Sequence, residues 1–91
     1  MTTITMKKDK FGFDTIIVNG RLIDMAGRFD SIEKQGSYTW TGKADGRNFV
    51  IYGGTKSGGR ANEWFVRWDT LGDFEIKTSS AAECVRVINN S

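Results

Sequence analysis

Histidine and proline are absent from this 91-residue chain, and there is a single cysteine, Cys84. Without histidine the chain can form neither a Ser-His-Asp triad nor a His-ligated metal site, and it lacks the usual general base near neutral pH. One cysteine excludes an internal disulfide and a zinc site built from thiolates. Because no set of residues forms an acid–base or nucleophile pair, we expect a protein that is not an enzyme and uses no cofactor or metal.

Long hydrophobic runs are also missing. No apolar segment approaches the roughly 20 residues that a membrane-spanning helix needs. The first ten residues, MTTITMKKDK, have no apolar stretch after their lysines, so we expect no signal peptide there. The formal net charge of +2 permits an anionic partner without demanding one. We therefore expect a cytoplasmic protein without membrane association, either a monomer or a homodimer.

The residues that are present suffice for one small folded domain covering 1–91. Hydrophobic residues make up 38% of the chain and include six Phe, three Trp and two Tyr, enough to build a single core. Charged residues make up 26%, as on an ordinary globular surface, so disorder is not expected.

Turn signals recur about every ten residues, which is typical of an antiparallel meander. The first is Asn19-Gly20 in FDTIIVNGRLIDM, a favoured pair for a type I′ hairpin turn. This turn predicts that Ile16 lies opposite Ile23. A further strand is expected in GRFDSIEK, and residues 1–10 are expected to be frayed or to form an edge strand.

The clearest hairpin turns at Asp45-Gly46, within SYTWTGKADGRNFVIYGG. Its register places Trp40 opposite Ile51, and the alternation of side chains puts large residues on one face. The residues predicted to share that face are Tyr38, Trp40, Phe49 and Ile51.

The segment NEWFVRWDTL predicts another strand, because its large apolar residues recur with a period of two. Trp64, Val66 and Trp68 would join the core, and FEIKT would add one more strand. Phe65 lies on the opposite side, where it is free for a partner or packs under the helix.

A helix is predicted over residues 80–90, because Ser80 and Glu83 fit a capping box. Apolar residues then follow at i, i+3, i+4 and i+7 and form a stripe. The residues of this stripe are Ala81, Cys84, Val85 and Ile88. We expect Cys84 to be a buried small hydrophobe, and the fold to be α+β: an antiparallel β-meander of five or six strands with one C-terminal α-helix packed on the sheet.

The stretch YGGTKSGGRANEWFVRWD is the main candidate for a binding site. It is not a Walker phosphate loop, because Lys56-Ser57 precedes Gly58-Gly59 and a strand follows. Two interpretations of Gly53–Ala61 remain. It is either the solvated tip of a hairpin or a glycine-rich nest beside two cations that binds an anion through backbone N–H groups.

Aromatic residues beside basic ones complete the candidate surface. Such combinations stack bases in proteins that bind single-stranded nucleic acid, and Arg and aromatic side chains also dominate protein interfaces. The candidate partner-binding residues are Tyr52, Lys56, Arg60, Phe65 and Arg67.

At AGRFD, GGTKSGGRANEWFVRWD and TSSAAECVRVI the chain resembles small accessory proteins encoded by tailed bacteriophages. The resemblance covers about the C-terminal two-thirds of the chain and carries no catalytic residue with it. It implies a protein made during infection that binds and blocks a host factor. Known types inhibit CRISPR effectors, restriction enzymes or other defences, or sequester nucleotide signals.

The sequence thus leads to one expected function and two alternatives. We expect a non-enzymatic, phage-type protein that inhibits a host defence protein by occluding its functional surface. The alternatives are a nucleic-acid-binding protein that uses basic and aromatic strand residues, and a sponge for a nucleotide signalling molecule.

Overall fold

The structure is a computed structural model, and it describes residues 2–54 and 62–91. Its strands and helices are β1 (Ile4–Lys8), β2 (Asp14–Val18), β3 (Arg21–Met25), β4 (Phe29–Gly36), β5 (Thr39–Ala44), β6 (Arg47–Gly53), β7 (Trp64–Trp68), the 3-10 helix η1 (Asp69–Leu71), β8 (Glu75–Thr78) and α1 (Ala81–Asn89).

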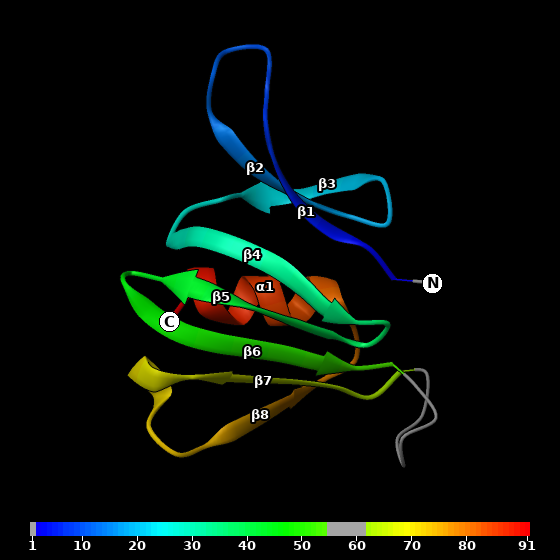
Figure 1. The fold of residues 1–91 in the computed structure, drawn as a ribbon, viewed down its shortest axis with the longest axis vertical. Helices are drawn as coiled ribbons and strands as arrows, with labels where there is room; N and C mark the ends of the chain where they lie inside the picture. Colours follow the sequence, from blue (N-terminus) through cyan, green and yellow to red (C-terminus); the bar gives the residue numbers. More distant parts are fainter. Residues whose placement is uncertain (1, 55–61) are drawn as a thin grey trace.

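The strands form two antiparallel sheets, one of three strands in the order β1-β2-β3 and one of five in the order β4-β5-β6-β7-β8. In Figure 1, α1 lies across one face of the five-stranded sheet and the β1–β2 hairpin extends away from it. The expected α+β class with a C-terminal helix packed on the sheet is therefore confirmed. The described residues form eight strands in two sheets, however, rather than five or six in one meander. Residues 4–8 form an edge strand, one of the two outcomes expected for the N-terminus.

Both predicted hairpin turns are present, and Asn19 and Asp45 each have a φ of 52°, as a type I′ turn requires. The second hairpin has the predicted register, with Trp40 opposite Ile51. In the first hairpin the predicted pairing of Ile16 with Ile23 is wrong. A register shift next to Ile16 pairs this residue with Asp24 instead, so one residue of β3 is left without a partner across the ladder.

The core lies between α1 and the inner face of the five-stranded sheet. Trp40, Trp64 and Trp68 are at most 3% exposed, and the Trp68 indole N–H donates to the Ala44 carbonyl oxygen at 3.1 Å. The predicted apolar stripe of the helix is buried against them and consists of Ala81, Cys84, Val85 and Ile88. The three-stranded sheet contributes Ile4, Ile16 and Val18 to the same cluster, so both sheets share one core.

Tyr38 does not belong to this core, contrary to the sequence prediction. It lies in the turn between β4 and β5, and 37% of its surface is exposed. The two-residue alternation that the prediction extended to Tyr38 holds only from Thr39 onward, where β5 begins.

The helix begins where the capping box predicted. The Ser80 hydroxyl oxygen accepts a hydrogen bond from the Glu83 backbone N–H at 3.1 Å. In return the Glu83 carboxylate accepts from the backbone N–H of Ser79, also at 3.1 Å, one residue before the cap. At the other end, the Asn89 side chain accepts a hydrogen bond from the Arg28 backbone N–H and donates one to the carbonyl oxygen of Met25, the last residue of β3. The helix is thereby fixed at both ends.

Gly42 in β5 provides a test of how closely β4 and β5 approach. The backbone of β4 lies so near that a Cβ on Gly42 would be 2.1 Å from the Ser31 carbonyl oxygen. We predict that Gly42→Ala lowers the free energy of unfolding by about 1–3 kcal/mol, because backbone must move to admit the methyl group. Urea denaturation measures this loss.

The matched control is Gly36→Ala in β4, where an added Cβ would have no neighbouring heavy atom within 4 Å. It should unfold close to the wild-type midpoint. Equal unfolding midpoints for the two variants would contradict the described packing of β4 on β5.

Candidate functional site

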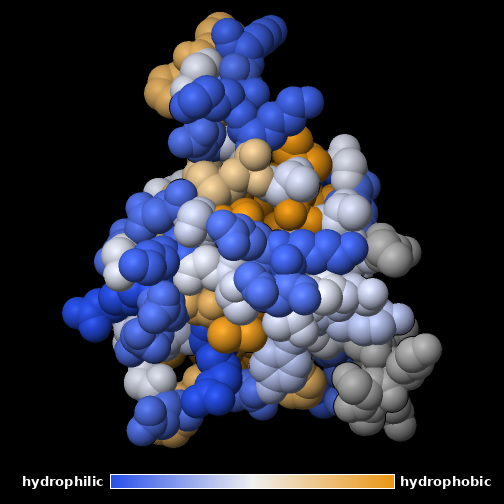
Figure 2. All heavy atoms as spheres, viewed as in Figure 1, coloured by the Kyte–Doolittle hydropathy of each residue, from blue (hydrophilic) through white to orange (hydrophobic). Residues whose placement is uncertain are grey.

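The outer face of the five-stranded sheet is the side opposite α1, and it carries the described part of the predicted site. Because side chains alternate along a strand, Phe65 and Arg67 project to this face while Trp64, Val66 and Trp68 point into the core. Two rows of neighbours cross it, Thr39-Tyr52-Phe65-Lys77 and Glu33-Thr41-Val50-Arg67-Glu75. Figure 2 shows hydrophilic side chains over most of this side, with a small hydrophobic area among them.

Tyr52 and Phe65 form the aromatic centre of the outer face. They are direct cross-strand neighbours on β6 and β7, and their rings stack with centroids 5.2 Å apart and planes inclined by 23°. Each is half-buried, because the rings cover one another. Phe65 faces away from α1, so the expectation that it packs under the helix is wrong. The other expectation, that Phe65 is free for a partner, stays a prediction.

Arg67 lies in the neighbouring row, opposite Val50, and is exposed. The structure thus brings together three of the five predicted partner-binding residues, Tyr52, Phe65 and Arg67. Lys56 and Arg60 lie outside the described residues, and so does most of the Gly53–Ala61 connection.

The two glycines that open this connection have a packing role. Gly54 has a φ of 72°, and a Cβ on it would lie 2.4 Å from the ring of Trp64. A Cβ on Gly53 would lie 2.4 Å from the Glu63 carbonyl oxygen. Close approach of β6 to β7 therefore explains these two glycines without an anion.

Charges of both signs occupy the outer face. Its cations are Lys43, Arg67 and Lys77, and its acids are Glu33, Glu63 and Glu75. Lys77 is paired with Glu63, with Nζ and Oε2 separated by 2.9 Å. The basic excess that marks a dedicated nucleic-acid surface is not found among these residues.

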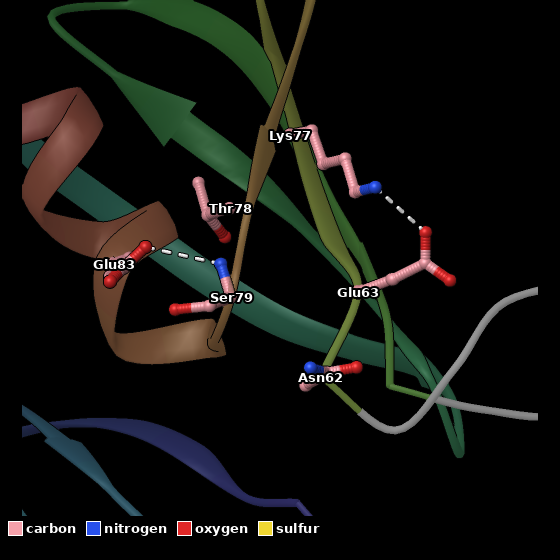
Figure 3. Close-up of a pocket in the computed structure, with 6 residues that line it drawn as sticks. All are labelled: Asn62, Glu63, Lys77, Thr78, Ser79 and Glu83. Atoms are coloured by element: carbon pink, nitrogen blue, oxygen red, sulfur yellow. Dashed lines mark hydrogen bonds and ion pairs between the residues drawn. The ribbon is translucent and has the colours of Figure 1, made fainter.

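Beside the outer face, an open polar recess of about 720 Å³ lies where β7 begins and β8 passes into α1. In Figure 3, Lys77 points toward Glu63, while Glu83 points toward the Ser79 backbone nitrogen. The hydrogen bond from that N–H holds the pKa of Glu83 below its usual range. Both carboxylates are engaged by donors, so the recess offers polar contacts rather than an acid–base pair.

The hairpin register that was predicted from the sequence also places Thr41 and Val50 on this face, as observed. Sequence reasoning missed Lys77, although the period of two along β8 was a usable signal for it. The position of Lys77 beside Phe65 also needed the register of β8 on β7, which the sequence leaves undetermined.

Within residues 2–54 and 62–91, no group of three or more His, Cys, Asp and Glu side chains could hold a metal ion. The same part of the chain has no helix with the length and apolar character that crossing a membrane requires. No protein-family model matches this chain, and no curated protein or solved structure matches it either.

Cys84 is buried, as the sequence predicted, and its sulfur lies 3.1 Å from the Thr78 hydroxyl oxygen. Burial raises the pKa of the thiol to about 11, an effect that the Thr78 hydrogen bond only partly offsets. At pH 8 the native thiolate fraction should therefore fall about 100-fold below that of an ordinary cysteine.

We predict that Ellman's reagent at pH 8 labels the native protein at least about 100-fold more slowly than the protein in guanidinium chloride. The absorbance of the released thiolate measures both rates. Similar rates in the two states would contradict the burial of Cys84 on the inner side of α1.

Proposed function

We propose that this protein is a non-catalytic binding protein of a bacteriophage or prophage that acts in the cytoplasm of the host. It inhibits a host defence protein by covering that protein's functional surface. The observation that carries the proposal is the stacked pair Tyr52–Phe65 beside the exposed Arg67, outside the core. Aromatic and Arg side chains contribute most of the energy at protein interfaces. The resemblance to phage accessory proteins supplies the setting.

The surroundings of the pair favour a protein partner. Thr39 and Thr41 lie on one side of the two aromatics, and Lys77 lies on the other, so a polar rim encloses a small apolar centre. Protein interfaces commonly have this arrangement. Because the residues lie on hydrogen-bonded strands, little conformational entropy is lost when a partner covers them.

Nucleic acid is the second candidate, because an aromatic pair beside an arginine on a sheet could stack bases. The equal numbers of cations and acids named on the outer face favour the protein partner over it. Binding of nucleic acid should not quench tryptophan fluorescence, since the three tryptophans are buried. Anisotropy of a labelled single-stranded oligonucleotide, measured at low and high salt, is the appropriate test.

The sponge for a nucleotide messenger depends on Lys56 and Arg60, outside the described residues. It predicts that a cyclic nucleotide or an adenosine-ribose compound raises the melting temperature by mass action.

We predict that a double variant, Phe65→Ser with Arg67→Glu, binds the host target about 30-fold or more weakly, because it removes two central contacts. The immobilised protein is used to capture proteins from bacterial extract. Mass spectrometry identifies those that the wild type retains, and titration of the purified target gives the Kd.

The matched control is Phe74→Ser with Arg21→Glu, which removes the same residue types at exposed positions outside the two rows that cross the outer face. It should retain the target, and circular dichroism should show both variants folded. Equal capture by the wild type and the outer-face variant would refute the assignment of this surface. Salt-sensitive oligonucleotide binding that the variant abolishes would replace it with the nucleic-acid function.

A further inference from the structure

The loop between β1 and β2 carries two of the most exposed aromatic side chains in the described chain. Phe11 is 73% exposed and Phe13 is 60% exposed. The hairpin that holds them projects from the body at one end of the longest axis, which measures 41 Å (Figure 1). Figure 2 shows hydrophobic atoms at its end, next to hydrophilic ones. We call residues 9–13 the hairpin tip.

The hairpin tip is held in one conformation by its own hydrogen bonds. The Asp9 carboxylate oxygen Oδ1 accepts from the backbone N–H groups of Phe11 at 2.8 Å and Phe13 at 3.0 Å. The Asp9 backbone N–H donates to the Phe13 carbonyl oxygen at 2.8 Å, and the Gly12 N–H donates to the Asp9 carbonyl oxygen at 3.1 Å. Gly12, with a φ of 85°, allows the turn.

These bonds fix the backbone while leaving both rings in solvent. A loop that needed only to connect β1 to β2 could do so with polar residues, as turns commonly do. Here the backbone is restrained by hydrogen bonds and the apolar side chains are exposed to solvent. Little conformational entropy of the backbone would therefore be lost on binding. That combination is characteristic of an anchor for another molecule.

The charges of the hairpin indicate which kind of molecule fits. Lys8 is paired with Asp14 at 3.3 Å, and the Lys10 ammonium lies over the Phe11 ring, 5.2 Å from its centroid. Among the described residues, neither Lys7 nor Lys10 has a carboxylate within ion-pairing distance. The hairpin therefore presents two apolar rings, with two cations that lack a carboxylate partner in the part of the chain that the structure describes.

An anionic membrane is a poorer match than a protein. Over residues 7–14 three lysines stand against two aspartates, a net charge of +1. Segments that bind anionic lipid use clusters of four to eight basic residues, about as many as attraction to the surface requires. A pocket on a protein needs only local complementarity to two rings and two cations.

We propose that the hairpin tip inserts Phe11 and Phe13 into an apolar pocket with an acidic rim on the target protein, with Lys7 and Lys10 facing the acids. This inference rests on the proposed function and adds a second contact site to it. The hairpin tip and the outer face belong to different sheets that share one core, so their spacing is fixed by the fold.

The test places a photo-crosslinking residue, p-benzoylphenylalanine, at position 11, 13 or 65, with position 74 as the control. The probe is bacterial extract, and the crosslinked protein is then purified and titrated. We expect one and the same protein to be crosslinked from positions 11, 13 and 65, and none from 74. Phe74 is a matched control because it is 74% exposed on the turn between η1 and β8.

Titration of the purified target then compares three variants. Phe11→Ser with Phe13→Ser should weaken binding about 100-fold, as expected for two anchors removed. Asp9→Ala keeps both rings but removes the acceptor that orders the tip, and should weaken binding about 5-fold to 10-fold. Phe74→Ser should bind within about 3-fold of the wild type.

The outcomes separate this inference from the proposed function. Crosslinks from position 65 alone, with wild-type affinity for the Phe11→Ser, Phe13→Ser variant, would overturn the inference and leave the proposed function standing. Absence of any crosslinked protein would overturn both. Two further results would show that the hairpin tip binds something other than a pocket on a protein target. In the first, the wild type sediments with phosphatidylcholine–phosphatidylglycerol vesicles and the Phe11→Ser, Phe13→Ser variant does not. In the second, the wild type self-associates and that variant does not.

Discussion

Burial of three tryptophans beneath α1 is the constraint from which the rest of the structure follows. Trp64 and Trp68 are four residues apart on β7, so their side chains point to the same face of the strand and both are buried. The same geometry leaves Phe65 and Arg67 no position but the opposite face. The position of Phe65 on the outer face is thus a consequence of how the core is filled, and the register of β6 then sets Tyr52 beside it. A slip of one residue would exchange the core residues for those of the outer face.

The two proposed contact sites share a physical design. Each displays aromatic side chains from backbone that is already hydrogen-bonded, on strands in the outer face and within the loop in the hairpin tip. Neither depends on a reactive group, and the one thiol is buried with a raised pKa. A protein of this kind can act by covering a surface, because a rigid display loses little entropy on binding. The charges beside the rings, Arg67 at one site and Lys10 at the other, would contribute to the choice of partner.

Local signals in the sequence were strong enough to predict much of this fold. Ser80 and Glu83 located the start of the helix, and the two type I′ turns located their hairpins. The prediction from the sequence failed at two positions where the local pattern does not determine the structure. The turn at Asn19-Gly20 gives no local sign of the bulge beside Ile16, and Tyr38 lies in a turn although the strand pattern extends to it. For the site, the alternation on β7 identified Phe65 and Arg67. Phe11 and Phe13 were overlooked because the lysines around them suggested a frayed end, although Asp9 and Gly12 were a usable turn signal.

Hydroxyl-radical footprinting, which measures the oxidation of individual side chains, tests the central claim most directly. The account predicts that in the free protein Trp40, Trp64 and Trp68 are protected while Tyr52 and Phe65 are oxidised. It also predicts that binding of the captured target suppresses the oxidation of Tyr52 and Phe65. Oxidation of the tryptophans in the native protein, or unchanged oxidation of Tyr52 and Phe65 in the complex, would contradict it.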